Sequence, residues 1–242
     1  MGSVLLETTA PPSDAPAPAL WLASRSPRRA ELLRAAGFVF AAFDPPYDDP
    51  SDPNRVAGVP GASGVPGGPE LARWLAERKA ASVAEADPPG LSDGAVLLTA
   101  DTLVVAPGGG LLGTPESADQ AVATLRELRH ATHTIATGVC LHRAGGADGA
   151  GRDTSSFLAT ARVTFGVLDD ALLDAYVAGG GWRGKAGGYN LEERQRDGWP
   201  VAVDGDPDAV MGLPVAALVP RLAALGVTPR VAPKRKESAT DG

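Results

Sequence analysis

The apolar residues of this chain fall into short runs and alternating stretches that predict β-strands. Residues 96–105 are apolar apart from two threonines and Asp101, which predicts a buried strand that could break at Asp101. Residues 132–141 and 157–165 alternate between apolar and polar side chains, as a strand with one buried face does. The predicted strands cover residues 19–23, 96–105, 132–141, 157–165, 200–203 and 209–211.

Apolar positions three and four residues apart predict helices between these strands. Leu71, Trp74 and Leu75 form such a stripe near the start of residues 70–85. Ser26-Pro27 and Thr114-Pro115 indicate helix starts, because Ser and Thr cap a helix and proline suits its first position. Helices are predicted from Ser26 to Gly37, over 70–85, from Thr114 to Leu128, from Asp169 to about Ala178, and over 214–225.

Strands and helices are interleaved along the chain, which favours the α/β class with a mixed sheet. We expect one folded domain over residues 19–226, with a Pro- and Gly-rich insertion at 44–69. Residues 1–18 are rich in Pro, Ala, Ser and Thr and predict a disordered tail. Residues 227–242 predict a second, basic tail.

Composition narrows the functional classes. The chain has 242 residues, 44% of them hydrophobic, which is enough for a full core. Its net charge of -7 argues against a general nucleic-acid binder. The single Cys140 excludes an intrachain disulfide and fits a reducing compartment. We find neither an apolar run long enough to span a membrane nor a secretory signal, so the expected location is the cytoplasm.

The stretch from Ser24 to Arg29 predicts an anion site. It reads as strand, tight turn and helix start, with Arg28 and Arg29 in the first helical turn. Cations are poorly placed at the positive end of a helix dipole, so a bound anion would explain them. Backbone N–H groups and guanidinium groups together bind phosphate well. A pair of solvated arginines beside a helix cap is the alternative.

Two further side chains are candidates for chemistry. Burying Asp101 in so apolar a strand is costly unless it is paired, ligates a metal or opens into a cleft, where a carboxylate can take a proton from water. A turn stabilised by Asp101 and Thr102 is the alternative. Lys185 lies among glycines that allow close approach to a phosphate, although a solvated loop fits equally well. By its own pattern, Lys79 is a helix-surface lysine, and Asp49 lies in a Pro-rich loop.

Other reaction classes have little support in the sequence. The histidines show no metal-ligand spacing with Cys140 and are interpreted as structural or surface groups. No Gly-x-Ser-x-Gly elbow and no Cys/His pair point to covalent hydrolysis.

The segment from Leu22 to Leu33 closely resembles the opening motif of the Maf family of nucleoside triphosphate pyrophosphatases. Further similar motifs follow in the family's order and extend the resemblance over residues 19–225. They include Glu77-Arg78-Lys79-Ala80, Ala100-Asp101-Thr102, Gly113-Thr114-Pro115, Lys185-Ala186-Gly187-Gly188-Tyr189 and Val210-Met211-Gly212-Leu213-Pro214.

The resemblance implies an α/β fold with a mixed twisted sheet, flanking helices and two lobes around a cleft. It also implies hydrolysis of a nucleoside triphosphate to the monophosphate and pyrophosphate with a divalent cation, Mg²⁺ or Mn²⁺. Neither nucleic acid nor a membrane is an expected partner, and a homodimer is the family's suggestion. The residues carried over are Asp101 as proton acceptor and metal ligand, Asp49 as a second metal ligand, Ser26, Arg28, Arg29, Lys79 and Lys185 as substrate ligands, and Arg28, Thr102 and Glu192 at positions linked to base choice.

Three positions depart from the family pattern. Thr114 stands where the family usually has lysine, Glu192 where it has glutamine, and Asp49 where it has glutamate. Because the family is also linked to the control of septum formation, and because Thr114 and Glu192 depart from its pattern, a non-catalytic nucleotide-binding regulator of cell division and septation is a second hypothesis. A hydrolase that releases orthophosphate from another anion is a third.

Overall fold

One mixed sheet of seven strands organises the part of the chain that the structure describes. The computed structural model describes residues 19–45, 67–86, 88, 91, 94–143, 145 and 153–230. The strand order is β2-β1-β3-β5-β6-β7, and β4 pairs with β3 outside this path. The strands are β1 (Leu20–Ala23), β2 (Ala41–Phe43), β3 (Val96–Val105), β4 (Leu111–Leu112), β5 (Thr132–Arg143), β6 (Asp153–Phe165) and β7 (Val201–Asp204).

The central strand β3 joins a parallel half of the sheet to an antiparallel half. β1 pairs in parallel with β2 and β3, whereas β3, β5, β6 and β7 pair in antiparallel fashion. The suggested break at Asp101 is wrong, because β3 continues through Asp101, which pairs with Gly138 of β5. Ten consecutive residues of β3 pair with β5, and this ladder keeps the backbone extended.

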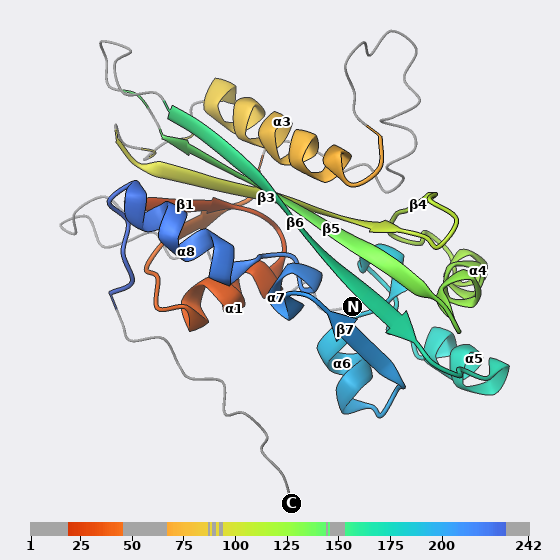
Figure 1. Cartoon of the computed structure of the whole chain (residues 1–242). Helices are drawn as coiled ribbons and strands as arrows, with labels where there is room; N and C mark the ends of the chain where they lie inside the picture. Colours follow the sequence, from red (N-terminus) through yellow and green to blue (C-terminus); the bar gives the residue numbers. More distant parts are fainter. Residues whose placement is uncertain are drawn as a thin grey trace, which may run out of the picture.

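Helices cover both faces of the sheet (Figure 1). On one face, α3 (Glu70–Ala86) packs its small and aliphatic residues, such as Ala76 and Val83, against Leu97 and Cys140. On the other face, α1 (Pro27–Ala35) and α8 (Val215–Ala224) pack on Leu20, Leu22 and Leu98. The predicted α/β class is therefore confirmed.

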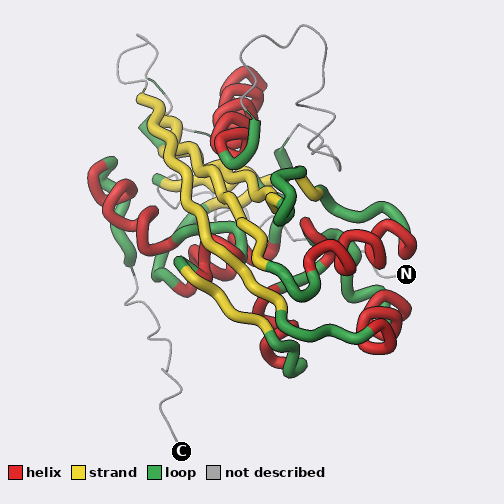
Figure 2. The backbone as a smooth tube through the Cα atoms, turned by 45° about the vertical axis from the view of Figure 1, so that its right-hand side comes forward, coloured by secondary structure: helices red, strands yellow, loops and turns green. Residues whose placement is uncertain are grey.

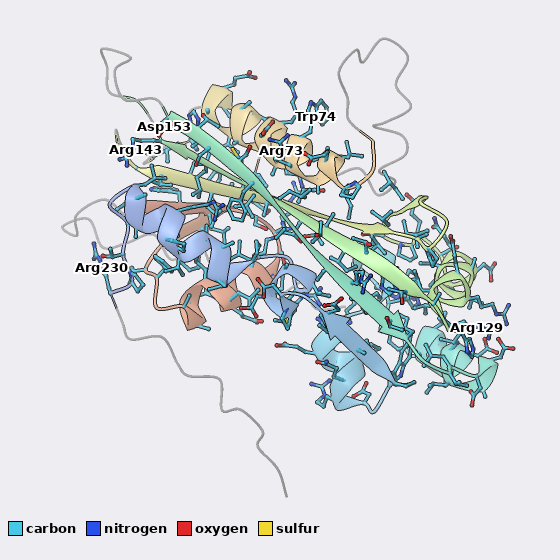
Figure 3. The ribbon with its side chains drawn as sticks, viewed as in Figure 1. Arg73, Trp74, Arg129, Arg143, Asp153 and Arg230 are labelled. Carbon is cyan, nitrogen blue, oxygen red and sulfur yellow. The ribbon has the colours of Figure 1, made fainter. Side chains whose placement is uncertain are left out.

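A second lobe forms around the far end of β5 and β6, and Figure 2 shows this long strand pair running through both lobes. The helices of this lobe are α4 (Ala118–Leu128), α5 (Asp170–Ala178) and α6 (Leu191–Arg196), with the short 3-10 turn η1 (Ala186–Gly188). Its core includes Leu125, Phe165 and Trp199. On its surface Arg129 donates to Asp170 at 2.8 Å (Figure 3), and this contact lowers the pKa of Asp170.

Two predicted elements differ in the structure. The helix expected from Thr114 begins instead at Ala118, because Ser117 is the residue whose side chain accepts a capping hydrogen bond, from the Gln120 N–H. The strand predicted at 209–211 is wrong. That stretch belongs to helix α7 (Pro207–Val210) and the turn after it, since Asp206 caps the helix and Pro207 opens it.

The chain ends contribute little to the described structure. Residues 1–18, 46–66 and 231–242 lie outside the described residues, so most of both predicted tails and of the insertion falls there. Residues 227–230, predicted to start the basic tail, are described: Val227 is buried, and the Arg230 N–H donates to the Gly37 carbonyl. No helix in the described ranges has the length and apolar character needed to cross a membrane.

Candidate active site

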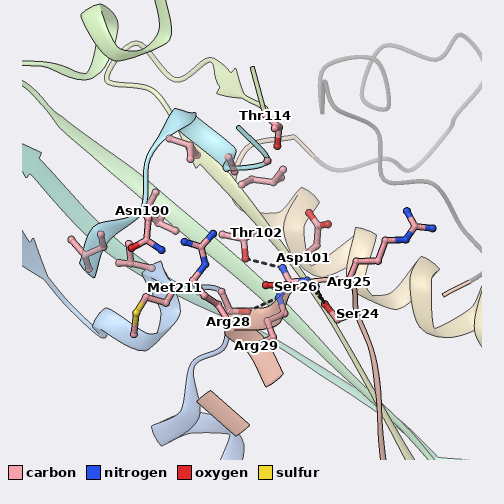
Figure 4. A pocket seen from close by; sticks show the side chains of 18 of the residues that line it. Ser24, Arg25, Ser26, Arg28, Arg29, Asp101, Thr102, Thr114, Asn190 and Met211 are labelled. Carbon is pink, nitrogen blue, oxygen red and sulfur yellow. Dashed lines mark hydrogen bonds between the residues drawn. The ribbon is translucent and has the colours of Figure 1, made fainter. Parts of the chain in front are cut away.

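A cavity of about 330 Å³ lies between the two lobes. Its walls come from the β1–α1 turn, the middle of β3, the segment before α4, the loop around η1 and the residues that follow α7. Its lining includes Ser24, Arg25, Ser26, Arg28, Arg29, Asp101, Thr102, Thr114, Tyr189, Asn190, Met211 and Gly212. Most of the residues named from the sequence as candidates for chemistry therefore share one cavity (Figure 4).

The start of α1 presents polar groups to this cavity. Ser26 is the N-cap and Pro27 opens the helix, as predicted, but the Ser26 side chain makes no capping hydrogen bond. The first turn contains no acidic residue, although acids are favoured there. A helix start with this composition is suited to an anionic ligand.

Arg29 is held rigidly by three hydrogen bonds. Its guanidinium donates to the Gly212 carbonyl at 2.9 Å, to Ser24 Oγ at 3.2 Å and to Thr102 Oγ1 at 3.2 Å (Figure 4). Thr102 Oγ1 lies 3.0 Å from Thr137 Oγ1, and Thr137 donates to the Ala209 carbonyl at 2.8 Å. This network ties α1, β3 and β5 to α7 and the turn after it.

Arg28 differs from its neighbour in having no such network. It is partly buried and lines the cavity, yet no described residue forms a hydrogen bond or ion pair with its guanidinium. Its donors are thus available to a ligand, whereas three of the five N–H donors of Arg29 are already used. Two arginines that look equivalent in the sequence have separate roles in the fold.

Asp101 is paired with a buried lysine. Lys79 Nζ lies 2.5 Å from Asp101 Oδ1, and the two side chains are only 7% and 13% exposed. The interpretation of Lys79 as a helix-surface residue is therefore wrong. Close packing of α3 on β3 and β5 buries it, and the ion pair offsets the cost of removing its charge from water.

Lys185 and Glu192 lie at the margin of the site. Lys185 does not line the cavity, although its neighbours Gly184 and Ala186 do, and its ammonium pairs with Glu193. Glu192 is exposed and lies outside the lining. The structure thus brings Ser26, Arg28, Arg29, Asp101 and Thr102 into the cavity, with Lys79 directly behind Asp101.

Other titratable groups near the site are buried and neutral. His133 Nε2 lies 2.7 Å from Tyr189 Oη, and burial lowers the pKa of His133 to about 4. Burial raises the pKa of Cys140 to about 12, so its thiol is protonated and unreactive at neutral pH. The burial of His133 fits its interpretation from the sequence as a structural group.

Comparison with known proteins places the chain in a family. A family model described as Maf-like protein matches residues 19–225. The chain belongs to the Maf family. Its curated Maf relatives include a dTTP/UTP pyrophosphatase of Salinibacter ruber, 38% identical over 199 residues, which are 82% of this chain and 87% of the relative. A dTTP/UTP pyrophosphatase of Pelotomaculum thermopropionicum is 34% identical over 205 residues, covering 85% and 95% of the two chains.

The residues at which this Maf chain departs from the family pattern do not all lie in the cavity. Thr114 lines the cavity and leaves the capping of α4 to Ser117. Glu192 is exposed and does not line the cavity, and Asp49 lies outside the described residues.

Three residues that shape the site were not among the predicted site residues: Asn190, which lines the cavity, and Thr137 and Gly138, which do not. Thr137 and Gly138 lie on β5, where alternation predicts a strand but does not indicate which neighbours it meets. Asn190 lines the cavity and caps α6. The signal available for Asn190 was local: an Asn followed by an acid-rich stretch is typical of a helix N-cap.

Proposed function

We propose that this Maf chain hydrolyses dTTP and UTP to the nucleoside monophosphate and pyrophosphate. The observation that carries the proposal is one cavity that holds the cationic start of α1 and the Asp101 carboxylate together. The relatives of Salinibacter ruber and Pelotomaculum thermopropionicum are dTTP/UTP pyrophosphatases, which supports these substrates. We also propose a cytoplasmic enzyme, since nucleotide substrates and a free thiol both fit a reducing cellular compartment.

Binding begins at the helix start. The Arg28 guanidinium, the Ser26 hydroxyl and the backbone N–H groups of α1 bind the triphosphate oxygens. Arg29, held by its three hydrogen bonds, provides a fixed positive charge that needs no rearrangement when the substrate arrives. Lys185 joins the phosphate ligands by exchanging Glu193 for a phosphate oxygen.

Hydrolysis takes place beside Asp101. Its carboxylate orients a water molecule and accepts a proton from it as the water oxygen attacks the α-phosphorus. The bond between the α-phosphorus and the bridging oxygen breaks, and pyrophosphate leaves with its charge stabilised by the cationic side chains. Lys79 holds the carboxylate in place through the ion pair.

The cavity fits a divalent cation that is bound largely by the substrate. In the described part of the chain, no group of three or more His, Cys, Asp or Glu residues could hold a metal ion, and Asp101 is the one carboxylate of the lining. Mg²⁺ in nucleotide sites is commonly held by one or two carboxylates and by substrate phosphates. Asp101 is the proposed ligand, with Asp49 as the second, and the cation would neutralise phosphate charge.

Pyrophosphate release from a panel of nucleoside triphosphates with Mg²⁺ or Mn²⁺ tests the proposal. We expect release from UTP and dTTP, and a loss of kcat of roughly 100- to 10,000-fold in Asp101→Asn, because the amide cannot accept the proton. Isothermal titration should show that this variant still binds nucleotide. Asp174→Asn, a change at an exposed aspartate on α5, is the matched control and should keep full activity.

Three outcomes would contradict the proposal. Ordinary turnover by Asp101→Asn would remove Asp101 from the reaction. Release of orthophosphate instead of pyrophosphate would point to a different hydrolase. Nucleotide binding without turnover would support the regulatory alternative.

A further inference from the structure

The cavity has two chemically different ends. Figure 4 shows Asp101, Ser24 and Arg25 toward one end and Asn190 and Met211 toward the other. Met211 lies toward this end, as does Arg28 (Figure 4), and the apolar and aromatic side chains of the cavity lining are Ile135, Tyr189, Leu191, Val210 and Met211. Because the reacting phosphorus must lie beside Asp101, the nucleoside extends toward Asn190, where apolar side chains can cover the faces of a flat base.

Asn190 provides a polar group at this end of the cavity. It is only 6% exposed, and it lines the cavity while acting as the N-cap of α6. Its Oδ1 accepts a hydrogen bond from the Glu193 N–H at 2.9 Å. No described residue bonds to its amide nitrogen Nδ2.

The capping bond determines which atom of the amide is left for a ligand. An asparagine amide has one accepting oxygen and one donating NH₂ group. A flipped amide would place its NH₂ against the Glu193 N–H, so two donors would face each other. The oxygen is therefore occupied by the capping hydrogen bond, and the side chain can present only N–H donors to the cavity.

An N–H donor discriminates between the pyrimidine bases. The 4-position of uracil and thymine carries a carbonyl oxygen, which accepts a hydrogen bond, whereas that of cytosine carries an amino group, which donates one. An amino group facing the Asn190 NH₂ would leave both donors without an acceptor.

We propose that Asn190 is a specificity-determining residue that donates a hydrogen bond to O4 of uracil or thymine and thereby excludes cytosine. The inference rests on the proposed hydrolysis of dTTP and UTP, and it adds the group that selects them. Asn190 thus has two roles, because it caps α6 and also lines the cavity.

The test compares kcat/KM for UTP and CTP, which differ only at the 4-position and in the proton on N3. In Asn190→Asp the cap is retained, because Asp caps helices as well as Asn does, but the side chain now offers only acceptors. We expect the UTP/CTP ratio to fall by about tenfold or more, since an acceptor suits the cytosine amino group. Asn190→Ser, which also keeps a cap, should reduce the preference without reversing it.

The ratio separates base recognition from a general effect of charge. A new negative charge in the cavity would weaken the binding of all nucleoside triphosphates alike, so the charge alone would leave the UTP/CTP ratio unchanged. Gln195→Glu adds the same charge at an exposed position of α6 outside the lining and should keep the wild-type ratio. Thermal melting of each variant shows whether it is folded.

The outcomes distinguish the two proposals. If the wild type prefers UTP and Asn190→Asp keeps that preference, the role of Asn190 is overturned and the proposed function stands. If the wild type hydrolyses CTP as efficiently as UTP, the role of Asn190 is overturned, whereas the proposed hydrolysis of UTP and dTTP stands. If no nucleotide yields pyrophosphate, the proposed function fails and the role of Asn190 fails with it.

Discussion

At the residue scale, adjacent side chains of the same type have different tasks. Arg29 is fixed by Ser24, Thr102 and Gly212, whereas no described residue pairs with Arg28. Preorganised charges stabilise a developing negative charge without reorganisation, and unpaired donors are suited to binding the substrate directly. The division of tasks depends on which tertiary partners each arginine meets.

Thr137 determines which hydroxyl donates and which accepts in the hydrogen-bond network around Arg29. Its hydroxyl has one proton, which it donates to the Ala209 carbonyl, so it must accept the proton of Thr102. We expect Thr137→Val to leave Thr102 and Ala209 partly unsatisfied and to cost about 1–3 kcal/mol of stability. Because Thr102 then turns away from Arg29, kcat/KM should fall by about tenfold, while Thr137→Ser should restore it.

Thr99→Val is the matched control for Thr137→Val. Thr99 is equally buried and donates to the Ala76 carbonyl at 2.7 Å, on the face of the sheet that α3 covers. The Thr99→Val variant should lose about as much stability as Thr137→Val and should keep the wild-type kcat/KM. In an Arg29→Ala background, Thr137→Val should add no further kinetic loss, since neighbours in one network are not additive. Full additivity there would contradict a positioning role.

At the element scale, the position of α3 depends on one glycine. A Cβ on Gly138 would lie 2.3 Å from backbone atoms of Ala72 and Arg73, so α3 must move away if that position carries a side chain. Gly138 pairs with Asp101 across the sheet, and α3 carries Lys79. Close packing of helix on strand thus brings the two halves of the ion pair together.

We therefore expect Gly138→Ala to destabilise the protein by about 3 kcal/mol, at the upper end of the usual cost of overpacking. Its activity should also fall, because a displaced α3 separates Lys79 from Asp101. Urea unfolding and pyrophosphate release measure the two effects. Gly110→Ala is the control, since a Cβ there meets nothing within 4 Å, and its stability should change by less than about 0.5 kcal/mol. Wild-type stability of Gly138→Ala would disprove the tight contact.

Local signals predicted most elements but not their exact limits. Periodicity located β3, β5 and α3 closely, because both the strand and the helix pattern reflect which face is buried. The stretch at 209–211 reads as apolar, yet Asp206 and Pro207 before it start a helix. Thr114 and Ser117 are both plausible caps, and only the path of the chain past the cavity selects Ser117.

At the scale of the whole molecule, the second lobe encloses a buried histidine. His133 is 1% exposed, and it packs against Phe165 and Tyr189 with its Nε2 on the tyrosine hydroxyl. Its Nδ1 has no hydrogen-bond partner in the described part of the chain. The lobe is therefore built for a neutral imidazole, because a proton on His133 would be a charge without a counterion.

This arrangement predicts an acid-sensitive fold. The pKa of His133 falls from 6.5 to about 4 on folding, so the unfolded chain binds more protons between these values. The contribution of His133 to stability is nearly constant above about pH 6.5 and should decrease as the pH falls through this window, by about 2 kcal/mol at pH 5. Urea unfolding at pH 7, 6 and 5 measures the slope.

His133→Gln removes the titrating group and should flatten the slope between pH 6.5 and 5, even if it lowers stability at neutral pH. The ordinary pKa values of carboxylates lie below this window, so they contribute little to it. An unchanged slope in His133→Gln would assign the acid sensitivity to other groups.

The order of residues alone was enough to predict the α/β class, most strands and helices, and the helix start that carries Arg28 and Arg29. These features depend on spacing and capping within a few neighbouring residues, which the linear chain contains in full. Three features could be seen only in the folded chain: Lys79 is buried against Asp101, Arg29 is fixed while Arg28 is open to a ligand, and Asn190 lines the same cavity. Burial, charge pairing and access depend on segments tens of residues apart, which become neighbours only when the sheet and its helices pack.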